Sequence, residues 1–161
     1  MKYHDITKDD MKNGDGLRVV LWVSGCSHHC KGCQNPVTWD PEDGVLFDEK
    51  ARQELFDELE KDYVSGITFS GGDPLYEGNR PMILKLLQEI KKQFPQKTIW
   101  LYTGDCWEHI LEYPEMSLID VLVDGEYQEQ LRDTSLYWCG SKNQRIINVQ
   151  ESLKSGRVVL K

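Results

Sequence analysis

The sequence predicts an α/β protein with a mostly parallel sheet that forms a partial, open (β/α) barrel. Strand-like and helix-like segments alternate along the chain, and a polar or glycine-rich loop follows each of the first four strand-like segments. A β-α-β-α-β order favours parallel strands joined by right-handed crossovers. The 161 residues suit one domain, residues 1–161, and are too few for a closed eight-stranded barrel of roughly 250 residues.

The first predicted strand and helix lie in the N-terminal part of the chain. Residues 18–24 are rich in β-branched and aromatic side chains and follow the turn-prone segment 13–16, which predicts a buried strand. A helix is expected over residues 48–62, where Asp48 can cap the first turn. The apolar side chains of this helix share one stripe, formed by Ala51, Leu55 and Leu59.

Two further strands flank a second helix. Residues 66–70 and 98–102 are short apolar segments typical of buried strands. Between them, residues 81–94 predict a helix that begins with Pro81, a residue suited to the first turn. The apolar side chains of this helix recur at helical spacing, at Ile83, Leu86, Leu87, Ile90 and Phe94.

The C-terminal third of the chain gives weaker signals. A short helix is expected over residues 107–112, and a fourth strand over residues 119–123. Residues 145–149 and 157–160 are two further strand candidates, on either side of the turn-like segment 154–156.

The composition indicates a soluble cytoplasmic protein that binds neither nucleic acid nor membrane. The net charge is −8, so broad attraction to the phosphate backbone of nucleic acids is not expected. No apolar run reaches the roughly 18 residues needed to span a bilayer, and residues 1–10 lack the apolar stretch of a secretory signal. Because thiols stay reduced in the cytosol, the five cysteines are not expected to form disulfides.

Three of the cysteines form a compact motif. Cys26, Cys30 and Cys33 lie within eight residues, in the spacing C-x3-C-x2-C. Thiolates are the usual ligands of iron–sulfur clusters, and four of them complete a 4Fe–4S cube. Three thiols in one tight loop can therefore hold a cube by three corners and leave its fourth iron open to an outside ligand.

A structural zinc site is the alternative interpretation of this motif. His28 or His29 could complete a site of three cysteines and one histidine. Zinc motifs usually pair C-x2-C with a second ligand pair at a distance. The remaining cysteines, Cys106 and Cys139, are isolated in the sequence and form no such pair.

Polar or glycine-rich loops follow four predicted strands. The cysteine motif follows the first strand, and the loops 71–74, 103–104 and 124–125 follow the next three. In parallel α/β folds, ligands bind at the carboxyl ends of the strands. These loops are therefore expected to form one site. For Asp124 the alternative interpretation is an ordinary Asp-Gly turn.

The order of these motifs resembles that of the radical S-adenosylmethionine enzymes, in which a Gly-Gly-Asp or Gly-Gly-Glu loop after the second strand follows the C-x3-C-x2-C motif. The resemblance implies a 4Fe–4S cluster held by the three cysteines, with its fourth iron chelated by the amino and carboxylate groups of S-adenosylmethionine. It also implies that Gly71, Gly72 and Asp73 lie against the methionyl end of that cofactor, and that the open barrel is the type found in this superfamily.

The resemblance places the adenine of the cofactor beside the third cysteine. Many members carry an aromatic residue just before that cysteine, whereas this chain has Gly32. The adenine is therefore expected to rest on the backbone at Gly32, Cys33 and Gln34, and Asp124 is the residue expected near the ribose.

Over nearly its whole length the chain resembles the activating proteins of anaerobic (class III) ribonucleotide reductases. The similar stretches are residues 22–26, 30–35, 70–75, 99–104, 121–125 and 141–145. The resemblance implies that one electron from the reduced cluster cleaves S-adenosylmethionine to methionine and a 5′-deoxyadenosyl radical. That radical takes an α-hydrogen from a glycine of the reductase large subunit. An electron donor such as flavodoxin is implied as well, and no general base or nucleophile is required.

Two other functions remain open at this point. The chain could activate a different glycyl-radical enzyme, such as pyruvate formate-lyase, although it lacks an additional ferredoxin-like set of cysteines. It could also be a zinc-stabilised binding module with no enzymatic activity, if the cysteine motif holds zinc.

Overall fold

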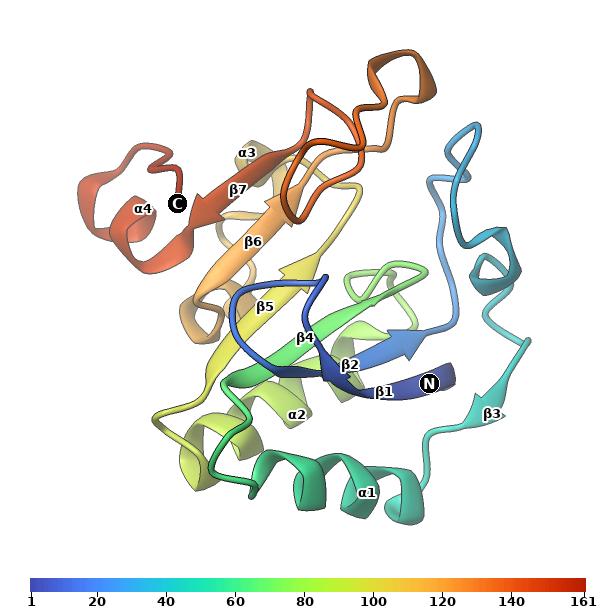
Figure 1. Cartoon of the computed structure of the whole chain (residues 1–161), viewed down its shortest axis with the longest axis vertical. Helices are drawn as coiled ribbons and strands as arrows, with labels where there is room; N and C mark the ends of the chain where they lie inside the picture. Colours follow the sequence, from blue (N-terminus) through green and yellow to red (C-terminus); the bar gives the residue numbers. More distant parts are fainter.

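The computed structural model describes residues 1–161 and has a mixed α/β fold around one open, seven-stranded sheet (Figure 1). The strands follow the order β3-β1-β2-β4-β5-β6-β7 across the sheet. Their bounds are Lys2–Asp10 (β1), Arg18–Val23 (β2), Val45–Leu46 (β3), Gly66–Gly71 (β4), Thr98–Tyr102 (β5), Val121–Asp124 (β6) and Arg145–Asn148 (β7). The central strands β2, β4, β5 and β6 are parallel, as the sequence predicts. Strands β1 and β7 pair antiparallel to them at either side.

The three expected helices are present: α1 and α3 are shorter than predicted, and α2 is shifted by one residue. The α-helices are Glu49–Leu59 (α1), Arg80–Gln93 (α2), Trp107–Ile110 (α3) and Val149–Ser155 (α4), and the 3-10 helices are Pro36–Thr38 (η1), Pro114–Leu118 (η2) and Glu129–Leu131 (η3). Asp48 caps α1 as predicted, because its carboxylate accepts a hydrogen bond of 2.9 Å from the backbone N–H of Ala51. No helix in the structure combines the length and the apolar character needed to cross a bilayer.

The structure differs from the sequence prediction at both ends of the chain. Strand β1 was not expected, because its side chains are polar on both faces and only Ile6 is buried. Residues 157–160 form no strand, and Leu160 makes only an isolated bridge to Ile147. The unexpected helix α4 is capped by Asn148 and ends at Gly156, whose left-handed backbone (φ 68°) suits glycine.

The two faces of the sheet are covered in different ways. The main core is a cluster of 27 buried residues that packs the sheet against the helices. The opposite face carries a small cluster of Trp100, Val121 and Val123. Loops cover this second face, including residues 11–17, which pass in front of β4 and β5 in Figure 1. All four α-helices pack on the other face, so this second face is here called the helix-free face. Its loops leave room for a binding site.

Candidate functional site

The loops that follow the parallel strands form a cavity of about 150 Å³, here called the cluster cavity. Its walls come from the cysteine motif after β2 and from the loops after β4, β5 and β6. The predicted residues that line it are Cys26, Cys30, Cys33, Gly71, Gly72 and Asp73. The structure thus brings the three cysteines and the glycine-rich loop together, as the positions at the strand ends predict.

Backbone hydrogen bonds fix the cysteine motif at its two ends. The N–H of Cys26 donates to the carbonyl oxygen of Trp39 at 3.0 Å, which links the motif to the segment after η1. At the other end, the N–H of Cys33 donates to the carbonyl oxygen of Cys30 at 3.1 Å. The N–H of Asn35 points at the sulfur of Cys33, with Sγ 3.4 Å away. Hydrogen bonds to sulfur are among the features that tune iron–sulfur clusters.

Burial opposes ionisation of two of these thiols. Burial raises the pKa of Cys26, while the backbone N–H groups of His28 and His29 act in the opposite direction. Burial also raises the pKa of Cys30, against a smaller effect of the backbone N–H of Tyr127. These thiols therefore need a metal, which displaces the thiol proton directly, to become thiolates near neutral pH.

The glycine-rich loop after β4 lies directly on the backbone that precedes Cys26. The N–H of Asp73 donates to the carbonyl oxygen of Gly25 at 2.7 Å, and the N–H of Gly72 donates to Val23 at 2.8 Å. A Cβ at Gly72 would lie 2.4 Å from the oxygen of Gly25, so a side chain has no room there. Close packing against the cysteine motif is thus a structural reason for glycine here, and contact with a cofactor ammonium group stays a prediction.

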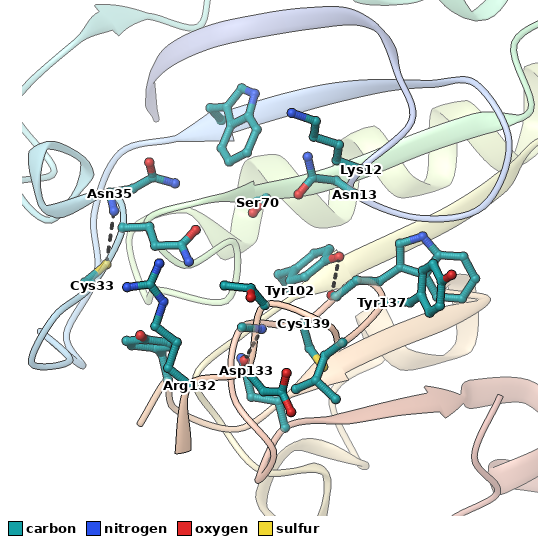
Figure 2. Close-up of a pocket in the computed structure, with 18 of the residues that line it drawn as sticks. Lys12, Asn13, Cys33, Asn35, Ser70, Tyr102, Arg132, Asp133, Tyr137 and Cys139 are labelled. Atoms are coloured by element: carbon teal, nitrogen blue, oxygen red, sulfur yellow. Dashed lines mark hydrogen bonds between the residues drawn. The ribbon is translucent and has the colours of Figure 1, made fainter. Parts of the chain in front are cut away.

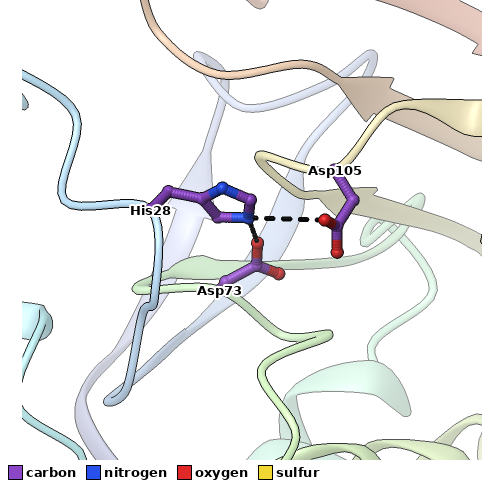
Figure 3. Close-up of side chains that lie close together, drawn as sticks. All are labelled: His28, Asp73 and Asp105. Atoms are coloured by element: carbon purple, nitrogen blue, oxygen red, sulfur yellow. Dashed lines mark ion pairs between the residues drawn. The ribbon is translucent and has the colours of Figure 1, made fainter. Parts of the chain in front are cut away.

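Asp73 is buried and its carboxylate is fully occupied. One oxygen accepts from the N–H of Leu75 at 2.8 Å. The other accepts from the hydroxyl of Thr103 at 2.9 Å and from the N–H of Gly104 at 3.0 Å. The ring of His28 lies 3.1 Å from the same oxygen (Figure 3). Asp73 therefore holds neighbouring loops together, and its contact with the cofactor stays a prediction.

His28 lies among carboxylates. Its hydrogen bond to Asp73 is the main factor that raises its pKa to about 9, with a further contribution from Glu126 and with burial acting in the opposite direction. In the protonated imidazole, Nδ1–H donates to Glu126 and Nε2 forms an ion pair with Asp73.

The carboxylate of Asp124 is bound by other protein groups and does not face the site. It is buried, accepts a hydrogen bond of 2.8 Å from the N–H of Trp107 at the start of α3, and pairs with Arg145, which also pairs with Glu108. It does not line the cluster cavity, whereas the following Gly125 does. These contacts favour the turn interpretation of Asp124, and its contact with a ribose stays a prediction.

A larger cavity of about 720 Å³ lies beside the cluster cavity. The two cavities share five lining residues, which are Cys33, Ser70, Tyr102, Tyr127 and Gln144. Of the residues predicted near the adenine, Cys33 and Gln34 line the large cavity, while Gly32 lines neither cavity. Figure 2 shows Arg132 on the Cys33 side of the large cavity and Tyr137 at the end away from it.

Sequence reasoning assigned no role to Tyr127 and Gln144, which line both cavities. The amide oxygen of Gln144 accepts from the N–H of Gly140 at 2.9 Å, and its nitrogen donates to the carbonyl of Gly125 at 3.1 Å. Gln144 therefore holds the loop between β6 and β7 in place over the helix-free face. The similar stretch at residues 141–145 was the available signal for this role.

The thiols fit a cluster better than a single zinc ion. A zinc ion lies about 2.3 Å from each thiolate, so thiols that share one ion lie close together. His28, Asp73 and Asp105 are the group of three candidate ligands whose atoms all lie within 4.8 Å of one another. No cysteine belongs to that group, so the three thiols lie farther apart than ligands of one ion. In a cube each thiolate binds a different iron, so the wider spacing of the thiols fits a cluster.

The cluster cavity also offers an unused hydrogen-bond donor. The indole N–H of Trp39, a residue that lines the cavity, is buried without a partner and can donate to a bound acceptor.

Comparison with protein families defines the class of protein. The family described as "4Fe-4S single cluster domain" matches residues 12–147, which is most of the chain and includes every residue of the cluster cavity. The chain is thus an iron–sulfur protein of the single-cluster class.

Comparison with curated proteins gives the particular family. The chain is 44% identical over 146 residues to the anaerobic ribonucleoside-triphosphate reductase-activating protein of Enterobacteria phage T4, covering 91% of this chain and 93% of that protein. It is 41% identical to the protein of that name from Escherichia coli K12, covering 89% and 96%, and 40% identical to that from Haemophilus influenzae, covering 91% and 97%. The chain belongs to the family of anaerobic ribonucleoside-triphosphate reductase-activating proteins.

Proposed function

We propose that this chain activates an anaerobic ribonucleotide reductase as a radical S-adenosylmethionine enzyme. Cys26, Cys30 and Cys33 hold a 4Fe–4S cluster with one open iron, and S-adenosylmethionine chelates that iron. When bound, the cluster supplies the electron that cleaves S-adenosylmethionine reductively, and this cleavage leads to a glycyl radical on the large subunit of the reductase. An electron donor such as flavodoxin reduces the protein in the cytoplasm.

The observation that supports this function is the arrangement of three thiols on one cavity that adjoins a much larger one. The small cavity offers the cysteine ligands, and the large cavity offers room for a cofactor of drug-like size, for which pockets of roughly 300–1,000 Å³ are usual. The open sheet is accordingly the partial barrel of the radical S-adenosylmethionine type, formed by a single domain over residues 1–161.

In this scheme the chain's own residues bind and orient the cofactor, and they limit the access of water. Gly71 and Gly72 bring the loop after β4 against the cysteine motif, so that one amino-acid chelate can meet both. Cys33 and Gln34 line the wall on which the adenine rests. Trp22 and Trp138 add apolar surface to the large cavity, and apolar walls limit the access of water.

The decisive test is anaerobic reconstitution followed by incubation with candidate glycyl-radical proteins. Metal analysis is expected to find iron and sulfide at about four each per chain. The anaerobic ribonucleotide reductase is expected to acquire a glycyl-radical signal in electron paramagnetic resonance. Stoichiometric zinc without iron would contradict this function. A radical signal on pyruvate formate-lyase alone would show that the chain activates that enzyme and not the reductase.

The large cavity is also where we propose that the glycine-bearing segment of the reductase enters. Tyr137 (80% exposed) and Met11 (72% exposed) are the two most exposed large apolar side chains, and both line this cavity. Exposed aromatic anchors at the edge of a pocket are typical of partner-binding surfaces. The hydrogen atom that is transferred must come within reach of the cofactor, and this cavity adjoins the cysteine ligands.

Replacing Tyr137 by alanine is expected to weaken binding of the reductase about tenfold, because aromatic anchors at interfaces contribute roughly 1–2 kcal/mol or more. The measurement is the equilibrium dissociation constant of the activating protein and the reductase. Tyr63→Ala is the matched control, since Tyr63 is 55% exposed and lines neither cavity. Equal affinities of the two variants would place the reductase elsewhere on the surface.

A further inference from the structure

The imidazole of His28 links the cysteine motif to the other loops at the carboxyl edge of the sheet. Its Nδ1 lies 2.8 Å from Oε1 of Glu126, in the loop after β6. Its Nε2 lies 3.1 Å from Oδ2 of Asp73, in the loop after β4, and 3.7 Å from Oδ1 of Asp105, in the loop after β5 (Figure 3). One side chain between two cysteines thus contacts a residue from each of the three other loops.

The surroundings hold this ring in a fixed place. The side chain is only 14% exposed, and that of Asp73 is 2% exposed. The ring lies against the backbone of Gly104, where an added Cβ would be 2.4 Å from the nearest ring atom. Asp73 cannot turn away from the ring without losing its bonds to Leu75 and Thr103. The glycine after Thr103 is therefore explained by the space that the ring of His28 needs.

The neighbours of His28 in the motif have fewer protein contacts. Ser27, His29 and Lys31 are exposed to solvent, and the ring of His29 stacks on Trp39. The cysteine motif is tied to the loop after β4 at its base, through the backbone bond between Asp73 and Gly25. Farther along the motif, the paired ring of His28 is the polar link to that loop.

We propose that His28 is a positioning residue that sets the cysteine motif, and with it the open iron, against the Gly71–Asp73 loop. This inference rests on the proposed function, in which one chelating cofactor must meet both elements at once. The two elements lie about forty residues apart in the chain, so their separation depends on contacts between them. Hydrogen bonds and close polar contacts to carboxylates are suited to fix such a separation, and a preorganised site binds its ligand more tightly.

The test uses His28→Gln and Gly104→Ala in the cluster-loaded protein. Glutamine cannot donate to Glu126 and Asp73 from two sides, and the Cβ added by Gly104→Ala displaces the ring. Both variants are expected to keep their iron and sulfide but to bind S-adenosylmethionine about 10- to 100-fold more weakly, the range for lost hydrogen bonds to charged groups. The change that S-adenosylmethionine causes in the spectrum of the reduced cluster should be smaller in both. His109→Gln is the control, since His109 is an exposed histidine of α3 outside both cavities.

A double variant tests whether the ring carries the effect of Gly104. Without the imidazole, a Cβ at position 104 no longer meets the ring atoms that it would otherwise strike. His28→Ala combined with Gly104→Ala is therefore expected to bind S-adenosylmethionine no more weakly than His28→Ala alone, a non-additive result typical of residues in direct contact. Additive losses would overturn the link between the two residues.

Two results for His28→Gln overturn the inference. Affinity for S-adenosylmethionine within twofold of the wild-type value means that the ring does not position the motif. Loss of iron in parallel with affinity means that the ring retains the cluster and does not orient it. Failure of the proposed function is recognised separately, because then the wild-type protein itself lacks iron or does not bind S-adenosylmethionine.

Discussion

The Cys30→Ala variant is expected to lose reductive cleavage of S-adenosylmethionine completely while it keeps its fold. Cys30 lines the cluster cavity, and without it the cube would keep only two of the three thiolates that are proposed to hold it. None of the five cysteines belongs to the main core cluster, so removal of this thiol leaves the packing between sheet and helices unchanged. The activity is therefore expected to be lost while the free energy of unfolding stays nearly unchanged.

Three measurements check this expectation. Methionine formation from S-adenosylmethionine under a strong reductant should fall below detection, and the iron content should fall with it. The free energy of unfolding of the metal-free protein should stay within the range of about ±0.5 kcal/mol that is usual for substitutions outside the core. Cys106→Ala is the matched control, because Cys106 is exposed and lines neither cavity. Undiminished cleavage by Cys30→Ala would show that the ligands are assigned wrongly.

The parallel part of the fold could be predicted because its signals are local. Strand β5 begins and ends at the predicted residues, and β2 and β4 differ from prediction by one residue at an end. Strand β1 was missed because its stability comes from pairing with β2, while its own polar side chains show no alternation. Two-residue β3 depends in the same way on its pairing with β1, which no local pattern reveals.

The candidate site was predictable where a motif fixes the position of a residue relative to a strand end. The cysteines and Gly71–Asp73 meet at one cavity for this reason. The partners of Asp124 were not predictable, because Arg145 and Trp107 come to it only through the pairing of β6 with β7 and the turn into α3. The position of Tyr127 at the two cavities was not predictable either, because the loop between β6 and β7 that carries it returns over the helix-free face.

A buried arginine lies at the end of the sheet opposite to the site. Arg18 begins β2, its side chain has no exposed surface, and burial lowers its pKa to about 10, so it stays charged at neutral pH. All five of its N–H groups have acceptors, which are the hydroxyl of Thr68, the carbonyl of Asp15, the hydroxyl and carbonyl of Thr98 and the carbonyl of Ile67. The guanidinium also lies 5.5 Å from the ring centroid of Trp100. Arg18 therefore joins β2, β4 and β5 to the loop before β2.

Replacing Arg18 by methionine is expected to destabilise the protein by about 3–5 kcal/mol, because several buried acceptors lose their donor and each unsatisfied group costs roughly 1–3 kcal/mol. Methionine fills similar space but leaves the acceptors of Thr98 and Ile67 without their donor. Since domains of this size are stable by only about 5–15 kcal/mol, such a loss should lower the denaturant midpoint strongly. Arg18→Lys is expected to lose almost as much, because one ammonium group cannot replace the planar fork of five donors.

The control for this experiment is Arg157→Met, which changes an exposed arginine near the C-terminus and should leave the midpoint within experimental error. Replacement of a buried ionic network by apolar side chains stabilises some proteins, so the sign of the effect is informative. Here the acceptors are mainly backbone carbonyls and hydroxyls that remain in place after the substitution, and apolar packing cannot satisfy them. An Arg18→Met protein as stable as the wild type would mean that water reaches these acceptors and that the end of the sheet opposite to the site is open.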